Sequence, residues 1–167
     1  GLGQAYKRIN PKVKYFGVEI NSEAAALAVN KLDKVINIDI EKEITLPEDI
    51  NKIDCIIYGD IINHLRDPYS CIKKQIELLN KDAIFLACIP NIQNWSAIYN
   101  LLNGIWPRND SGLFDTTHLQ WFTKQSIIDL IEKLELSICE IQPLIYDQDK
   151  ADLFFKKIEP ILENFNV

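Results

Sequence analysis

The sequence of 167 residues contains no methionine, not even at position 1. A chain without the start residue does not begin at a natural start codon, so we expect a fragment or a processed product. No apolar run reaches about 18 residues, the length that spans a bilayer, and no basic stretch followed by an apolar one opens the chain. The sequence therefore predicts neither a transmembrane span nor a signal peptide.

Cysteine is scarce, and the four cysteines are widely spaced. No two of them form a CxxC pair, and Cys55 and Cys88 lie within apolar runs that are typical of strands. This spacing disfavours a disulfide framework and a zinc site. We expect four reduced, mostly buried thiols in a cytoplasmic protein without a metal site.

Basic residues are outnumbered by acidic ones, 18 against 24, which gives a net charge of −6. A chain of this charge lacks the broad basic face that binds phosphate backbones, so we expect no nonspecific nucleic-acid binding. Hydrophobic residues make up 47% and charged residues 25%, as in globular proteins. Together with the length, these values indicate one folded domain.

Short apolar runs alternate with amphipathic segments along the chain. This alternation predicts a doubly wound α/β domain with a mostly parallel sheet. Near-continuous apolar runs at 53–58 and 83–89 indicate strands buried on both faces. We assign residues 1–146 to this domain and 147–167 to a C-terminal helical tail. The expected strands are 14–20, 34–38, 53–58, 83–89 and 137–144, and the expected helices are 22–32, 69–79, 96–102, 124–134 and 149–164.

Acidic residues stand at the ends of three expected strands: Glu19, Asp39 and Asp60. In open α/β sheets, ligands bind at the carboxyl ends of the strands. One carboxylate there can accept hydrogen bonds from both hydroxyl groups of a ribose diol, and a second can accept a hydrogen bond from an exocyclic amine. The spacing therefore fits an adenosine ligand. Acidic residues at strand ends that only contact solvent would give the same sequence pattern.

Two glycines near the amino end, Gly1 and Gly3, precede a short expected helix over 4–9. Glycine lets the backbone approach a ligand closely, but it also serves ordinary tight turns. In the dinucleotide-binding fingerprint a third glycine would fall at Tyr6. Its absence, together with a second acidic strand end at Asp39, disfavours a nicotinamide-dependent dehydrogenase.

Five longer strings carry a resemblance to a known family. They are YFGVEINSEAAALA (15–28), VINIDIE (35–41), DCIIYGDIINHLRDP (54–68), IPNIQNW (89–95) and GLFDTTHLQWFT (112–123). With these strings, which span most of the chain, the sequence resembles the bacterial class I S-adenosylmethionine-dependent methyltransferases that act on small molecules or sugars. The resemblance implies a Rossmann-like fold, S-adenosyl-L-methionine as cofactor, and a small-molecule or glycan acceptor methylated at oxygen.

The resemblance also implies a set of cofactor contacts. A glycine loop passes under the methionine part, one acidic strand end holds the ribose, and the next contacts the adenine edge. Residues after the third expected strand meet the methionine amino group or line the pocket, and Ile62 belongs with them. The implied cofactor-binding residues are Gly1, Gly3, Glu19, Ile20, Asp39, Ile40, Asp60 and Ile61.

Two histidines, His64 and His118, are the catalytic candidates. His64 follows Asn63 where the family usually has Glu-His, and asparagine can neither act as a base nor bind a hard cation well. Histidine changes its charge near neutral pH, so His64 can still act as a general base. A structural role for His64 stays open, and His118 either hydrogen-bonds an acceptor or pins its loop to the sheet.

The aromatic residues near His118 could wall an acceptor pocket, although packing is the plainer role for Trp121 and Phe122. Arg108 follows Trp106-Pro107 and could meet an anionic acceptor. Asp115 and Thr117 are expected to satisfy the backbone of the loop rather than to catalyse. Pro90-Asn91 differs from the Asn/Asp-Pro-Pro-Tyr signature of enzymes that methylate base amino groups, which disfavours a DNA acceptor.

The resemblance implies a central strand before the glycine loop and a final antiparallel strand after position 167, and neither is in the sequence. We therefore expect an incomplete sheet, with a gap of about 10 Å at the centre, in a piece of a larger multidomain polypeptide. Two functions stay open: an active methyltransferase, and a non-catalytic module that keeps the fold for binding or scaffolding.

Overall fold

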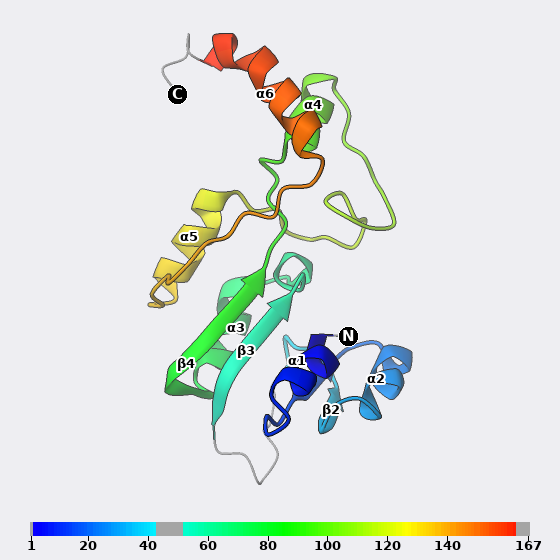
Figure 1. Ribbon diagram of the computed structural model, residues 1–167, viewed down its shortest axis with the longest axis vertical. Helices are drawn as coiled ribbons and strands as arrows, with labels where there is room; N and C mark the ends of the chain where they lie inside the picture. The colour runs from blue at the N-terminus through cyan, green and yellow to red at the C-terminus, as the bar shows by residue number, and fades with distance from the viewer. Residues whose placement is uncertain (1, 43–51, 163–167) are drawn as a thin grey trace.

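The computed structural model describes residues 2–42 and 52–162 (Figure 1). Helices and strands alternate in the first half of the chain, as the sequence predicts, and helices dominate the second half. The elements are α1 (Leu2–Ile9), β1 (Phe16–Glu19), α2 (Ser22–Val29), β2 (Lys34–Asn37), β3 (Ile53–Gly59), the 3-10 helix η1 (Ile62–His64), α3 (Pro68–Ile76), β4 (Leu79–Cys88), α4 (Trp95–Leu102), α5 (Lys124–Lys133) and α6 (Gln148–Leu162).

The four strands form two parallel pairs, β1 with β2 and β3 with β4. Within the described residues no ladder joins the pairs, so they form two separate two-stranded sheets. The gap expected at the centre of one incomplete sheet stays a prediction. At the carboxyl end of the β1–β2 pair, Glu19 lies opposite Asn37. At the carboxyl end of the β3–β4 pair, Gly59 lies opposite Cys88. The carboxyl ends of paired strands therefore lie together.

Side-chain caps fix where two of the helices begin. Asn21 Oδ1 accepts hydrogen bonds from the Glu23 and Ala24 amides at 3.0 and 2.9 Å, which starts α2. Thr123 and Ser126 form a reciprocal capping box at the start of α5. Asn21 and Thr123 suit these positions, because short polar side chains satisfy the free amides of a first helical turn.

The core lies on one face of the β3–β4 pair. Its buried members are Tyr58, Ile62, Ile72, Phe122 and Leu134, contributed by β3, η1, α3 and the region of α5. Tyr58 donates a hydrogen bond to the Gln75 side chain of α3, and burial raises the Tyr58 pKa far above its usual range. The polar tip of Tyr58 is therefore satisfied inside the core.

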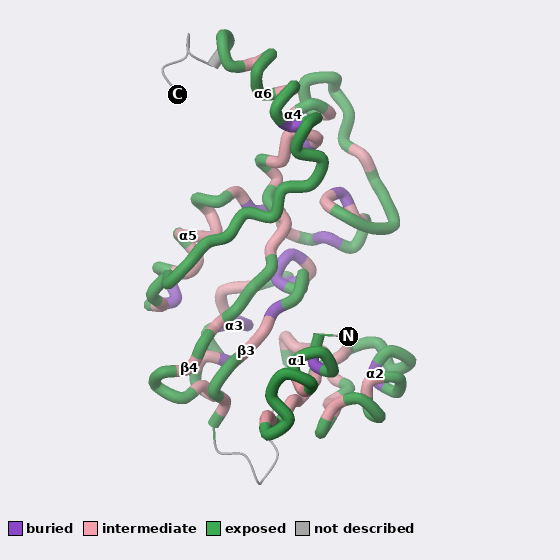
Figure 2. The backbone as a smooth tube through the Cα atoms, in the orientation of Figure 1, coloured by how far each residue is buried: buried purple, intermediate pink, exposed green. Residues whose placement is uncertain are grey.

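Many residues of β3 and β4 are exposed, which corrects the prediction of burial on both faces (Figure 2). Ile84 is 62% exposed and Leu86 is 52% exposed. Because side chains alternate along a strand, these two share the face opposite to Phe85, which packs against the core. A continuous apolar run specifies a strand here, but the described chain supplies no layer to cover its second face.

The cysteines follow the same pattern, so the prediction of mostly buried thiols is wrong. All four are free, but only Cys71 in α3 is buried. Cys55 and Cys88 lie in β3 and β4 and are exposed, as is Cys139. Burial raises the pKa of the Cys71 thiol to about 11, and the Glu41 and Asp39 carboxylates add to this.

The turn after β2 ties the two strand pairs together. Glu41 Oε1 accepts hydrogen bonds from the Arg66 and Asp67 amides, at 2.9 and 3.0 Å, just before α3. The Ile40 carbonyl oxygen accepts a further one from Gln75 Nε2 at 3.3 Å. These contacts place the segment after β2 beside the segment after η1.

The expected strand over 137–144 is not formed. This segment is extended but pairs with no other strand in the described chain. Its apolar residues Ile138, Ile141 and Leu144 are exposed. The prediction of a strand here is wrong, because a strand needs a partner and no described strand pairs with this segment.

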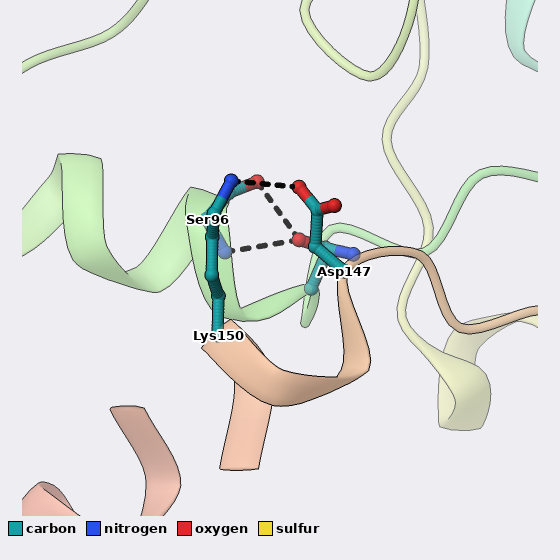
Figure 3. A network of polar contacts seen from close by, with 4 residues as sticks. Ser96, Asp147 and Lys150 are labelled. Atoms are coloured by element: carbon teal, nitrogen blue, oxygen red, sulfur yellow. Dashed lines mark hydrogen bonds and ion pairs between the residues drawn. The ribbon is translucent and has the colours of Figure 1, made fainter. Parts of the chain in front are cut away.

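Helix α6 packs against α4. The Phe154 ring lies 6.3 Å from the Trp95 ring and 6.4 Å from the Tyr99 ring, measured between centroids. Asp147 and Lys150 form an ion pair of 3.2 Å at the start of α6, near Ser96 of α4 (Figure 3). None of the described helices is long and apolar enough to cross a membrane.

Candidate functional site

The two predicted catalytic histidines come together in the structure. His64 ends η1, which follows β3 closely, and His118 lies in the loop before α5. Their ring centroids are 4.7 Å apart, with the rings edge to face. The contact depends on Asn63, whose carbonyl oxygen accepts hydrogen bonds from the Leu119 and Gln120 amides at 2.8 and 3.0 Å.

The contacts of His64 determine which of its nitrogens carries the proton. His64 Nδ1 lies 3.3 Å from the Thr117 carbonyl oxygen and 3.2 Å from Thr117 Oγ1. The carbonyl can only accept, and the hydroxyl already donates to Asp115 Oδ1 at 2.6 Å. Nδ1 must therefore be the donor, and the neutral ring keeps an unprotonated Nε2.

His118 is held in the same tautomer by a different partner. Its Nδ1 lies 3.1 Å from the Leu113 carbonyl oxygen, which can only accept a hydrogen bond. The Nε2 of neutral His118 is therefore also unprotonated. Leu113 belongs to the same long loop, so this contact holds the loop together and does not attach it to a strand. It leaves Nε2 of His118 available for contact with an acceptor, which stays a prediction.

Asp115 and Thr117 brace this loop, as the sequence predicts. Asp115 Oδ1 accepts hydrogen bonds from both the hydroxyl and the amide of Thr117, at 2.6 and 2.8 Å. These two bonds, the hydroxyl first, lower the Asp115 pKa below its usual range, and His118 and His64 add to the effect. Asp115, Thr117 and His64 thus form a chain that orients the His64 ring.

The lowered pKa predicts how this chain of contacts depends on pH. A carboxyl whose pKa is lower in the folded state stabilises the fold above its unfolded pKa, and that contribution is lost as pH falls through the folded value. We expect carbon-13 NMR titration to place the Asp115 midpoint below the ordinary value for aspartate. Thr117→Val should raise this midpoint, since it removes the largest cause. An unchanged midpoint would contradict the assigned contact.

Asn63 is a buried polar residue directly before His64. It is 1% exposed, and neither Oδ1 nor Nδ2 of its side chain has a hydrogen-bond partner in the described residues. Buried polar groups are normally paired, because an unpaired one costs about 1–3 kcal/mol. Asn63 therefore joins the two histidine segments through its backbone and leaves an unsatisfied amide beside them.

Glu19 and Asp39 lie at the carboxyl ends of paired strands or just after them. Glu19 Oε1 accepts the Asn21 amide at 2.8 Å, and Asp39 Oδ1 accepts the Glu41 amide at 3.0 Å. Each carboxylate keeps a second oxygen with no hydrogen-bond partner in the described chain. Ile20, which is 68% exposed, and Ile40 follow them directly.

Asp60 lies at the corresponding end of β3. Its backbone is left-handed, with φ of 54°, where the chain turns sharply from β3 into η1. Partial desolvation and the Asp60 carboxylate raise the pKa of the Cys88 thiol, so Asp60 faces the end of β4. Ile61 beside it is partly exposed, whereas Ile62 is completely buried in the core and does not line a pocket.

Gly3 is buried in the first turn of α1, and Gly1 lies outside the described residues. A Cβ on Gly3 would come within 2.6 Å of Leu32 Cδ2 and 2.9 Å of the Tyr15 ring. The glycine therefore allows α1 to pack closely beside β1 and the end of α2. Its role toward a cofactor stays a prediction.

A shallow pocket adjoins the histidine pair on the side of the long loop. Trp106 packs edge to face against Phe114 and Trp121, with ring centroids 5.0 and 5.3 Å apart. Phe122 belongs to the core, as expected, but Trp121 is 40% exposed. Residues that line the pocket are Trp106, Pro107, Arg108, Phe114, Asp115, Thr116, His118 and Trp121.

Comparison with known proteins identifies the fold. No protein-family model matches the chain, and no curated protein gives a significant match. Among solved structures, the chain is similar to an S-adenosylmethionine-dependent methyltransferase from Thermotoga maritima, described as a possible histamine N-methyltransferase, with a TM-score of 0.56 and 20% identity. The similarity covers 80% of this chain and 60% of that one, so the chain spans about three-fifths of that protein's length. It shows a Rossmann-like methyltransferase fold.

Proposed function

We propose that this chain binds S-adenosyl-L-methionine and transfers its methyl group to a hydroxyl group of a small molecule or sugar. The observation that carries the proposal is a single juxtaposition on a methyltransferase fold. The carboxylates of Glu19, Asp39 and Asp60 lie at the carboxyl ends of β1, β2 and β3 or just after them, and two histidines in ring contact lie just beyond β3.

Glu19 and Asp39 fit the adenosine part of this cofactor. Their remaining carboxylate oxygens are hydrogen-bond acceptors, and the ribose diol and the adenine amine are donors. We assign the ribose to Glu19 with Ile20 and the adenine edge to Asp39 with Ile40. Asp60 and Ile61 are assigned to the methionine end, together with Gly1 and Gly3.

The protein has limited chemistry to perform. When bound, the cofactor supplies an activated methyl carbon, to which the acceptor oxygen bonds while the carbon–sulfur bond breaks and leaves its electron pair on sulfur. The chain must hold the acceptor at attacking distance and in line. We assign the acceptor's hydroxyl proton to His64 Nε2, because Thr117 and Asp115 orient this ring from behind.

A continuous cofactor site requires that the two strand pairs be joined. β1 pairs only with β2, and β3 only with β4, in the described residues. One additional parallel strand between β1 and β3 would complete both ladders. We include such a strand in the proposal, whichever polypeptide supplies it.

A non-catalytic binding module is the second candidate. The separate strand pairs and the exposed face around Ile84 and Leu86 favour it, because an exposed apolar surface commonly contacts another protein. Such a module would keep the fold without binding the methyl donor.

Calorimetric titration with S-adenosylhomocysteine, the demethylated product, distinguishes these candidates. We expect saturable one-to-one binding by the protein in its full-length polypeptide, and none to NADH under the same conditions. Absence of S-adenosylhomocysteine binding would contradict the proposed function and favour the binding module. Binding of NADH instead would indicate a dehydrogenase.

A further inference from the structure

The Glu41 side chain joins two parts of the proposed site that are far apart in the sequence. Glu41 lies two residues after Asp39, in the turn that follows β2. Its Oε1 atom accepts hydrogen bonds from the backbone amides of Arg66 and Asp67, at 2.9 and 3.0 Å. Arg66 comes two residues after His64, the proposed base. One carboxylate oxygen therefore connects the strand end assigned to adenine with the segment that carries the base.

The turn that holds Glu41 is also attached to α3. Asp39 Oδ1 accepts a hydrogen bond from the Glu41 amide at 3.0 Å. The carbonyl oxygen of Ile40, between them, accepts hydrogen bonds from Gln75 Nε2 at 3.3 Å and from Cys71 Sγ at 3.5 Å, both in α3. The backbone of this turn is therefore fixed where the Glu41 carboxylate reaches across to the segment after η1.

On the other side of the contact, the partners of Glu41 determine the surroundings of the His64 ring. The Arg66 carbonyl oxygen accepts a hydrogen bond from Gln120 Nε2 at 3.4 Å. Gln120 lies in the same loop as Thr117, whose carbonyl and hydroxyl oxygens contact His64 Nδ1. A shift of Arg66 would therefore move the segment that bears the ring relative to the loop that orients it.

Both the charge and the length of Glu41 suit this contact. A carboxylate binds amide donors more strongly than a neutral oxygen does. Two amides from consecutive residues fix the direction of the contact as well as its distance. Aspartate at this position would keep the charge but end one methylene group short, and glutamine would keep the length without the charge. These two replacements therefore separate the effect of length from the effect of charge.

We infer that Glu41 is a positioning residue, which holds His64 at a fixed place relative to the strand end at Asp39 and so places the proposed base relative to the methyl donor. The inference rests on the proposed function for the roles of donor and base. The positioning itself can be measured in the protein without ligand, from the state of the His64 ring.

Nitrogen-15 NMR of the full-length protein with labelled histidine reports the tautomer of each ring, at a pH where both rings of the pair are neutral. We expect a single Nδ1-protonated state for His64 in the wild type, because Thr117 accepts a hydrogen bond from that nitrogen. Glu41→Asp and Glu41→Ala should replace this state by an exchanging mixture of tautomers, whereas Glu41→Gln should keep it in part. His118, held by Leu113, should stay unchanged in every variant and serves as the internal reference.

Asp67→Ala is the matched control. It removes the Oδ1 atom that caps α3 at the Ser70 amide, at 3.0 Å, but it keeps both amides that Glu41 binds. We expect the wild-type tautomer of His64 in this variant, whereas a Glu41 that only stabilised α3 would predict the same disturbance in both. The inference is overturned by the wild-type tautomer in Glu41→Asp, by an equal change in Asp67→Ala, or by a mixture of tautomers already in the wild type.

Titration with S-adenosylhomocysteine separates this inference from the proposed function. If the wild type does not bind this product, the proposed function fails, while the tautomers still decide the role of Glu41. If the wild type binds it and transfers methyl groups, Glu41→Asp should lower the rate by roughly 10- to 100-fold, the scale of a displaced catalytic group, with little change in affinity. An unchanged rate in Glu41→Asp would contradict the positioning role.

Discussion

Replacing His64 with alanine should lower the rate of methyl transfer by about 10²–10⁴-fold, the usual contribution of a positioned general base. The affinity for S-adenosylhomocysteine should stay at the wild-type value, because His64 is assigned to the acceptor and not to the donor. The rate can be measured with methyl-labelled donor and a panel of hydroxylated small molecules and sugars. This split between rate and affinity follows from the orientation of the ring by Thr117.

A purely structural His64 would also lower the rate if the loop moved, so a second readout is needed. Added imidazole should restore part of the activity of His64→Ala, because it supplies the missing base in the space left by the ring. A structural role predicts no such recovery. The thermal unfolding temperature of the variant shows whether the fold is kept. Wild-type turnover in His64→Ala would assign the residue to loop packing.

Replacing Glu19 with alanine should weaken S-adenosylhomocysteine binding by about 1.5–3 kcal/mol, the scale of a hydrogen bond to a charged group. In a calorimetric titration this corresponds to a rise in Kd of roughly 10- to 150-fold. The reason is the loss of the carboxylate oxygen that has no partner within the described protein.

Glu19 also contacts the Asn21 amide, so its removal affects the cap of α2 as well. Glu19→Gln keeps an oxygen for that amide and removes only the charge, and we expect an intermediate loss of affinity. Glu23→Ala, in the first turn of α2, makes the same change of charge without touching the strand end. Equal affinity in the wild type and Glu19→Ala would show that the ribose assignment is wrong.

Local structure was largely predictable from the sequence because it depends on neighbouring residues. The caps Asn21 and Thr123 and the apolar run that forms β3 carry their signals within a few positions. Whether other elements cover a strand depends on tertiary packing, which the neighbouring residues in the sequence do not determine. The runs around Tyr58 and Ile84 look alike in sequence, yet Tyr58 is buried in the core and Ile84 is exposed. The segment over 137–144 failed as a strand for the same reason, since no edge lies beside it.

The candidate site was predictable residue by residue but not as an assembly. His64 and His118 were each recognisable, whereas their contact depends on the Asn63 carbonyl, and a backbone acceptor leaves no mark on the sequence. The tautomers of both rings likewise follow from Thr117 and Leu113, which were not singled out as their partners. Burial of Ile62 corrects one pocket assignment, because residues after a strand can turn toward the core as readily as toward a ligand.

The central claim is that one adenosyl cofactor lies across the carboxyl ends of β1, β2 and β3. Amide NMR shifts on titration with S-adenosylhomocysteine test it most directly, since they report the location of binding as well as its strength. The account predicts saturating shifts concentrated at Glu19–Ile20, Asp39–Ile40 and Asp60–Ile61. Shifts confined to other surfaces, or none at saturating concentration, would contradict it.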